Sequence, residues 1–162
     1  MTAAAPAIVV HSLAHAVVAL EAAAEAGEAI VLLSAVDAGL SAGAGWWREV
    51  VAAARDCVRS ARMAALLDCG DDAGAAQAAL HEGIETIVFN GRDEVVERLA
   101  DIARQCGGSV LTERPEAALD LGDDFFAPPD ALRRRVLAML RGESADITRP
   151  RGRPMPRDDG TD

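Results

Sequence analysis

The sequence predicts an α/β fold built around a parallel sheet of five strands. Three observations favour it. Short aliphatic and β-branched runs alternate along the chain with helical stretches of about a dozen residues. The strand-like runs are apolar on both faces, which is typical of strands buried in a parallel sheet. Strict alternation of this kind indicates right-handed crossovers between neighbouring parallel strands.

Each element follows from its local pattern. Gly27, Gly83 and Gly107 directly follow three of the expected helices, where a left-handed cap commonly ends a helix. A loop of small residues, 37–45, leads into the second helix, and a last helix is expected over Ala131–Arg141. The expected strands are Ala7–Val10, Ile30–Leu33, Ala64–Leu67, Thr86–Phe89 and Ser109–Thr112, and the helices between them are His15–Ala26, Trp46–Val58, Asp72–Glu82 and Asp93–Cys106.

Composition changes after the fifth strand and divides the chain into three segments. Residues 1–114 form the expected domain of βα repeats. Residues 115–141 are acidic and turn-rich before the last helix, and we expect them to cover the domain. Residues 142–162 hold four arginines and three prolines without an apolar period, which predicts a disordered tail.

Charge and residue usage exclude several classes of protein. The net charge is −10 and all 16 basic residues are arginines, so no lysine is present for a Schiff base or a Walker A phosphate loop. The negative charge argues against nucleic acid as a partner. No apolar run reaches the roughly 18 residues of a membrane span, and no basic leader precedes an apolar run, so we expect a cytoplasmic protein that does not contact a membrane.

Polar residues follow each expected strand, at the edge where parallel α/β sheets bind ligands. Asp68 follows the third strand, where its carboxylate could act as a general acid or base, or could cap the next turn or helix. Glu113 is a second catalytic candidate after the fifth strand. The other residues expected at this edge are His11, Ser12, Ser34, Asp37, Cys69, Asn90, Arg92, Thr112 and Arg114.

The turn Asn90-Gly91-Arg92 combines a guanidinium with the start of a helix, which suits a phosphate or carboxylate group. The alternative is an ordinary turn. With Ser34, these three residues are the candidates for ligand binding. No histidine and cysteine spacing predicts a metal site, and nearby carboxylates should not lower the pKa of Cys69.

The order of parts from about Leu13 to Glu113 resembles the class II fructose-bisphosphate and tagatose-bisphosphate aldolases. Their Ala- and Glu-rich helix before an apolar strand corresponds to residues 17–33, and their motif of the type H-L-D-H-G to Leu66–Gly70. Further along, Ala79–Gly83, Phe89–Gly91 and Ala103–Glu113 resemble family segments of the types A-L-x-x-G, D-G-S and A-H-x-x-G-V-x-V-E-x-E.

The resemblance implies about half of a zinc-dependent (βα)8 barrel. Asp68 matches the aspartate that serves the family as proton donor, whereas Cys69 stands where the family has a zinc-ligating histidine. The later strands that supply the remaining zinc ligands have no counterpart here. We therefore expect no cofactor, and in particular no zinc.

Three hypotheses follow for function. The first is an aldolase-like domain without zinc-aldolase activity that binds a small anionic, phosphorylated metabolite or a protein partner. Because half a barrel leaves open strand edges, this hypothesis includes homodimerisation. The second is a lyase that uses Asp68 as general acid or base, with Asn90, Arg92 and Glu113 around it. The third is a degenerate receiver domain. Sequential strand order 1-2-3-4-5 favours a half-barrel, whereas order 2-1-3-4-5 indicates a flavodoxin-like sheet.

Overall fold

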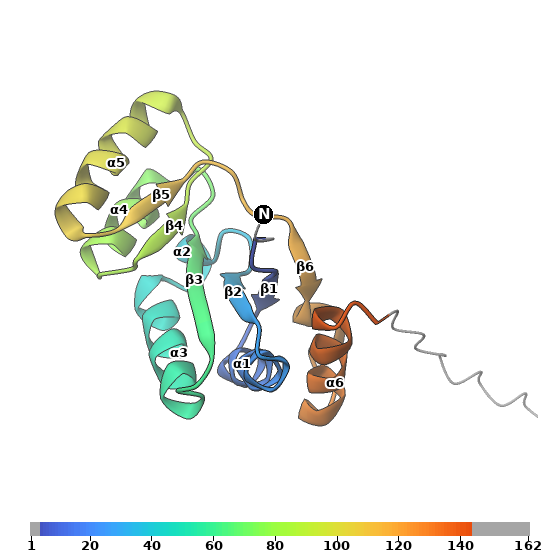
Figure 1. Ribbon diagram of the computed structural model, residues 1–162. Coiled ribbons are helices and arrows are strands. Elements are labelled where there is room, and N and C mark those ends of the chain that lie inside the picture. The colour runs from blue at the N-terminus through green and yellow to red at the C-terminus, as the bar shows by residue number, and fades with distance from the viewer. Residues whose placement is uncertain (1–3, 144–162) are drawn as a thin grey trace, which may run out of the picture.

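The computed structural model describes residues 4–143, which form one parallel sheet with helices packed against it (Figure 1). The sheet has six strands in the order β5-β4-β3-β2-β1-β6, and every neighbouring pair is parallel. The strands are β1 (Ala7–Val10), β2 (Ala29–Ser34), β3 (Arg62–Asp68), β4 (Thr86–Val88), β5 (Ser109–Leu111) and β6 (Ala117–Asp120). The helices are α1 (Leu13–Ala26), α2 (Ala38–Ser41), α3 (Ala44–Cys57), α4 (Ala73–His81), α5 (Asp93–Cys106), η1 (Leu121–Asp124) and α6 (Pro129–Leu140).

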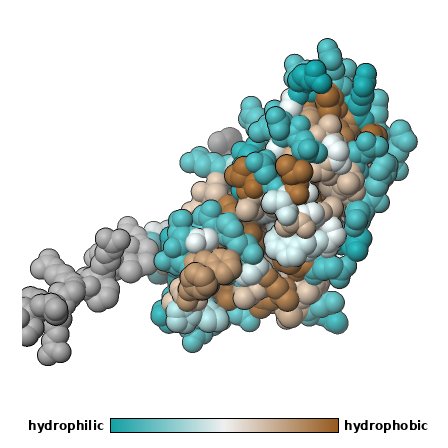
Figure 2. All heavy atoms as spheres, turned by 180° about the vertical axis from the view of Figure 1, so that it is seen from behind, coloured by the Kyte–Doolittle hydropathy of each residue, from teal (hydrophilic) through white to brown (hydrophobic). Residues whose placement is uncertain are grey.

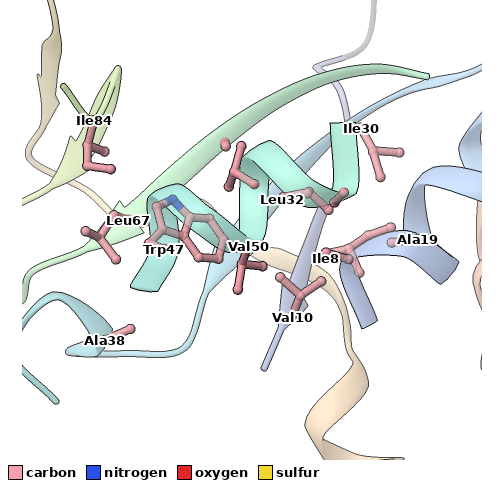
Figure 3. Close-up of a cluster of buried hydrophobic side chains, with 14 of the residues drawn as sticks. Ile8, Val10, Ala19, Ile30, Leu32, Ala38, Trp47, Val50, Leu67 and Ile84 are labelled. Carbon is pink, nitrogen blue, oxygen red and sulfur yellow. The ribbon is translucent and has the colours of Figure 1, made fainter. Parts of the chain in front are cut away.

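The large buried cluster lies between one face of the sheet and the helices. Alternate strand residues such as Ile8, Leu32 and Leu67 pack there with Trp47 of α3 (Figure 3). A second, small cluster on the other face consists of strand residues alone: Ala7, Val9, Leu33, Leu66 and Val88. Neighbouring helices pack in the order α6, α1, α3, α4, α5, which repeats the order of the strands they follow. Helices on one face in this order are typical of a barrel wall.

The strand order separates the hypotheses for the fold. Strands β1 to β5 lie beside one another in sequential order, as a half-barrel requires. The flavodoxin-like order 2-1-3-4-5 is therefore wrong, and the receiver hypothesis that depends on it is wrong as well.

Strand β6 was not predicted, since it lies within the acidic segment that we expected only to cover the domain. Its sequence, Ala-Ala-Leu-Asp, has no β-branched residue. It forms because the free edge of β1 offers hydrogen-bonding partners, and Leu119 pairs with Ile8 across that edge. Leu121, which follows directly, is fully buried and anchors the strand. The segment thus covers the β1 edge by extending the sheet.

Local sequence explains most differences in helix bounds. α1 begins at Leu13 because the Ser12 hydroxyl accepts a hydrogen bond from the His15 N–H at 3.2 Å. The expected loop 37–45 contains the short helix α2. α6 begins at Pro129, two residues earlier than expected, since proline is well accommodated in the first turn of a helix. Most of the expected tail, 144–162, lies outside the described residues.

The surface of the described part carries several exposed large apolar side chains. They are Leu13, Val36, Leu40, Leu111, Phe125 and Phe126. Figure 2 shows apolar areas between hydrophilic ones on the face seen from behind. None of the helices within residues 4–143 has the length and apolar character needed to cross a membrane.

Candidate functional site

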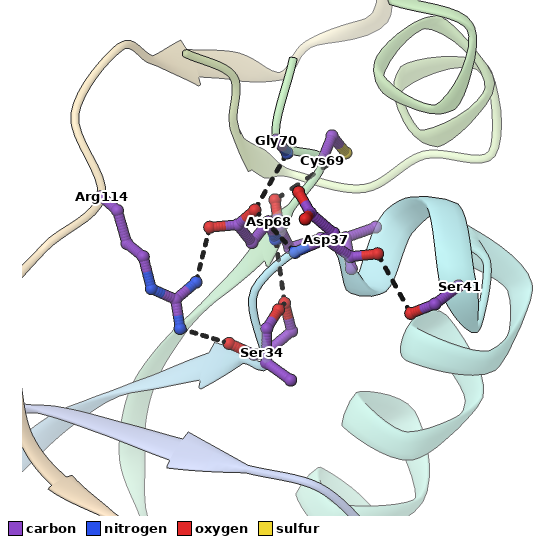
Figure 4. A network of polar contacts seen from close by, with 9 residues as sticks. Ser34, Asp37, Ser41, Asp68, Cys69, Gly70 and Arg114 are labelled. Atoms are coloured by element: carbon purple, nitrogen blue, oxygen red, sulfur yellow. Dashed lines mark hydrogen bonds and ion pairs between the residues drawn. The ribbon is translucent and has the colours of Figure 1, made fainter. Parts of the chain in front are cut away.

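Asp68, the last residue of β3, accepts three hydrogen bonds at the carboxyl edge of the sheet (Figure 4). The residue is only 3% exposed. Its Oδ1 accepts from the backbone N–H groups of Asp37 at 3.0 Å and Gly70 at 2.9 Å. Its Oδ2 forms an ion pair with Nη1 of Arg114 at 2.6 Å. The carboxylate is therefore engaged on both oxygens.

Arg114 and Ser34 complete this network. Nη2 of Arg114 donates to the backbone carbonyl of Ser34 at 2.7 Å. The Ser34 hydroxyl is fully buried, accepts from the Asp68 N–H at 2.9 Å and donates to the Ala35 carbonyl. Arg114 thus ties the connection after β5 to the ends of β2 and β3. We call Ser34, Asp68 and Arg114 the edge clasp.

The geometry of the edge clasp bears on the two roles considered for Asp68. A general acid needs a proton on an oxygen that substrate can reach, whereas all three contacts here are donations to the carboxylate. The cap of α4 is Asp72, whose Oδ1 accepts from the Ala75 N–H at 2.7 Å, and Asp68 bonds the turn before it. The arrangement favours a structural role for Asp68 in joining strand ends.

A close approach of two turns supports the same carboxylate. Asp37 adopts a left-handed backbone conformation with φ of 56°, which directs its N–H to Asp68. The Asp37 side chain lies against Gly70, where a Cβ atom would stand 1.9 Å from Oδ1. Position 70, which also has a positive φ of 55°, therefore requires glycine.

Cys69 does not suit the zinc-ligand role that the aligned family position implies. The residue is 1% exposed. Burial, and then the negative charges of Asp68 and Asp72, raises the pKa of its thiol to about 12. The side chain is therefore a neutral, buried thiol in this structure. Within residues 4–143 no three histidine, cysteine or acidic side chains are placed to hold a metal ion.

The residues predicted to bind a ligand differ in their exposure. Asn90 and Arg92 are exposed, and the Asn90 N–H donates to the Gly70 carbonyl at 2.9 Å, which places this turn beside the edge clasp. Gly91 is packed against the ring of Phe89, whose Cζ would lie 2.3 Å from a Cβ at this position. Ser34, by contrast, is buried within the clasp.

Glu113, the second catalytic candidate, is exposed and directly precedes Arg114. It is adjacent to the edge clasp in the sequence, but the residue that contacts Asp68 is Arg114. The predicted carboxylates therefore do not form a pair.

A second polar cluster at the same edge joins β1 to the end of β6. Nε2 of His11 lies 2.6 Å from Oδ1 of Asp120, and the same oxygen accepts from the Gly122 N–H at 2.8 Å. Burial acts to raise the pKa of Asp120, but the hydrogen bonds from His11 and Gly122, with the charges of His11 and Arg114, leave it lowered. His11 is predicted at this edge from the sequence, whereas Asp120 is not, since only the unpredicted pairing of β6 with β1 brings the two residues together.

His15 lies beneath this cluster and is 2% exposed. Its Nδ1 accepts from the His11 N–H at 3.4 Å, and its ring meets that of Phe125 edge-on with centroids 5.1 Å apart. The pKa of His15 is lowered, first by burial and then by the charge of His11, although a backbone hydrogen bond with Phe125 and the charge of Asp120 act in the opposite direction. His15 joins α1 to the segment after β6.

Comparison with known proteins gives the fold and little more. No protein-family model matches the sequence, and no curated protein matches it. A solved structure from Coccidioides immitis, of a protein proposed to be a fructose-1,6-bisphosphate aldolase, matches with a TM-score of 0.55 and 20% sequence identity. The match covers 66% of this chain and 40% of that one.

The chain thus has a distant aldolase-like α/β fold. It spans 40% of the length of the protein it matches, so the comparison concerns only part of that protein. At this level of identity the likeness concerns the arrangement of strands and helices, and function has to be argued from the residues present.

Proposed function

We propose that this aldolase-like domain binds a small anionic, phosphorylated metabolite at the carboxyl edge of its sheet, without zinc-dependent aldolase chemistry. The proposal rests on the contacts and burial of Asp68. The residue at the position of the family's proton donor is buried and engaged by Arg114, while Arg92 and Asn90 remain exposed beside it. Binding without this chemistry is the function that these contacts support best.

The ligand class follows from the groups that are exposed. The guanidinium of Arg92 and the amide of Asn90 can both donate hydrogen bonds to a phosphate oxygen. Arg92 forms no ion pair within residues 4–143, so its charge is available to a ligand. Because Asp93 and Glu94 already occupy the first turn of α5, the arginine has to supply the attraction.

Calorimetric titration tests this proposal. Dihydroxyacetone phosphate and fructose bisphosphate would be titrated, with and without zinc, into the wild type, Arg92→Ala and Arg98→Ala. Arg98 is an exposed arginine on α5, the helix that begins directly after Arg92, and serves as the matched control. We expect metal-independent binding that Arg92→Ala weakens about tenfold and Arg98→Ala leaves unchanged.

Two outcomes would contradict the proposal. Zinc-dependent binding together with cleavage of fructose bisphosphate would restore the aldolase hypothesis. If neither phosphate ester binds, the proposal that the domain binds a small anionic metabolite is wrong.

Protein binding is a second candidate function, favoured by one observation. Phe126 is 95% exposed and Phe125 is 45% exposed, and the two rings lie edge-on with centroids 5.1 Å apart. Exposed aromatic side chains at adjacent positions are typical of protein interfaces.

A further inference from the structure

Helix α6 has an inner side that packs on α1 and an outer side that is turned away from it. On the inner side, Arg133 forms an ion pair with Glu25 of α1, and Leu137, one turn further along, is buried. Because an α-helix turns about 100° per residue, Ala131 and Ala138 lie on the other side of the helix. We call the side that carries these two alanines the outer α6 face.

A hollow of about 440 Å³ lies on the outer α6 face. Alanine side chains form part of its walls, so a neighbouring segment of chain can approach the helix closely there. Two arginines lie toward the C-terminal end of the hollow, and an aspartate lies toward its other end. The residues that line it include Asp124, Ala127, Ala131, Arg134, Arg135 and Ala138.

The two ends of the hollow carry opposite net charge. Arg134 is exposed and, within residues 4–143, forms no ion pair. At the other end Asp124 pairs with Arg135, and Asp123 beside it is an exposed carboxylate without an ion pair in the described part of the chain. The end at Arg134 is therefore net basic, and the end at Asp123 is net acidic.

The chain leaves α6 at one wall of this hollow. Gly142 has a left-handed backbone with φ of 66°, and its N–H donates to the Met139 carbonyl at 3.1 Å. The N–H of Glu143 donates to the carbonyl of Ala138 at 2.9 Å. These two bonds form a Schellman motif, which turns the chain away from the helix direction. The residues after position 143 therefore begin beside Ala138.

An extended chain that runs back along α6 from this point has a definite register. It advances about 3.3 Å per residue while the helix rises about 1.5 Å per residue, so each extended residue passes about two helical ones. The third residue after Glu143 then reaches the level of Arg134 and Arg135. The fourth and fifth reach the level of Ala131, and the sixth to eighth reach the acidic end at Asp124.

The sequence after residue 143 has complementary side chains at these places. Asp146 is the third residue, Ile147 is the fourth, and Arg149 and Arg151 are the sixth and the eighth. The order acidic, apolar, basic along the chain thus opposes the order basic, small apolar, acidic along the outer α6 face. Charge and size both match in this direction.

We propose that residues 144–151 bind the outer α6 face of the same chain and run antiparallel to the helix. The Asp146 carboxylate pairs with Arg134, and the Ile147 side chain fills the hollow. Arg149 and Arg151 approach the acidic end. A segment that is tethered at the wall of the hollow has a high effective concentration there, which favours it over a separate protein as the occupant.

The proposal goes beyond both candidate functions and does not depend on the anionic ligand. Phe126 directly precedes Ala127 of the hollow, so a protein that binds the exposed rings would compete with residues 144–151. The proposal also narrows the tail expected to be disordered to the residues after 151. Because the segment buries one large apolar side chain, heating should release it before the domain unfolds, and the melting temperature then does not measure its binding.

Backbone ¹⁵N relaxation of the full chain, measured by NMR, tests the proposal. We expect order parameters above about 0.6 for the amides of residues 146–149 in the wild type, whereas a free segment gives lower values. Ile147→Asp should weaken the binding of the segment about tenfold or more, because a charged side chain does not fill an apolar hollow. Asp146→Arg should also lower these order parameters. Combining it with Arg134→Glu should restore them, since the exchanged charges again face one another.

Controls separate this contact from a general change of charge or fold. Met155→Asp makes a similar change outside residues 144–151 and should leave the order parameters unchanged. Circular dichroism would show that each variant is folded. Order parameters below about 0.6 at residues 146–149 of the wild type overturn the proposal. So does order that Ile147→Asp leaves unchanged, a double charge exchange that fails to restore it, or order that is lost on dilution, since a second copy would then supply the segment.

Discussion

At the scale of single residues, the edge clasp shows how a buried carboxylate becomes part of the framework. Asp68 has a side chain only 5% exposed, and Arg114, at 24%, is its counter-ion. The ion pair joins residues 46 positions apart, so it holds the chain after β5 against a strand that lies much earlier in the sequence. This accounts for the arginine that stands directly before the acidic, turn-rich segment.

Removal of Arg114 should therefore destabilise the fold. Arg114→Ala leaves the Asp68 carboxylate buried with two N–H donors and no opposite charge, which we expect to cost about 2–3 kcal/mol, less than a fully buried pair because Arg114 is partly exposed. Urea denaturation would measure this loss. Arg98→Ala is the exposed control, and Arg114→Ala combined with Asp68→Asn should lose less than the sum of the two single changes. An Arg114→Ala variant as stable as the wild type would contradict a structural role for the clasp.

His15 provides a prediction about pH, since its pKa in the folded state lies below the ordinary value of 6.5. The unfolded chain then binds more protons than the folded chain below about pH 6.5. Stability is complete above that pH and falls as the pH decreases toward the lower pKa of the folded state. We expect the melting temperature of the wild type to decrease between pH 7 and pH 5.

A matched pair of variants checks the source of this pH dependence. His15→Gln should lower the melting temperature at pH 7 but reduce its dependence on pH in this range. His81→Gln, which changes an exposed histidine, should keep the wild-type dependence. Equal slopes for the wild type and His15→Gln would exclude His15 as the cause.

At the scale of elements, the sequence predicts what is encoded locally. The helix expected over Asp93–Cys106 is α5 with the same bounds, because its apolar period is clear and glycine follows it. Strand β6 could not be predicted, since its four residues become a strand only against the free edge of β1. The same holds for the site. Asp68, Ser34 and Arg114 were placed at the carboxyl edge by position alone, whereas the approach of Asp120 to His11 follows from a pairing between distant segments.

At the scale of the whole molecule, residues 117–140 complete a core that the βα repeats begin. Leu121 and Val136 are fully buried, and Leu132 and Leu137 are nearly so. α6 packs against α1, and β6 pairs with β1, so both elements protect the first part of the chain. We therefore expect residues 1–114 and the covering segment 115–141 to be stable only together.

Truncation tests this interdependence. A chain of residues 1–116 loses the four buried side chains named above, each worth about 1.5–3 kcal/mol, which together approach the whole stability of a typical domain. It also exposes the edge of β1 and the apolar face of α1. We expect this chain to aggregate or to lack a cooperative thermal transition. A chain of residues 1–143 keeps every described element and should melt within about 2 °C of the full chain. Circular dichroism and light scattering would compare the three proteins. A cooperative, monomeric 1–116 chain would show that the βα repeats fold alone, and β6 and α6 would then be additions to a complete domain.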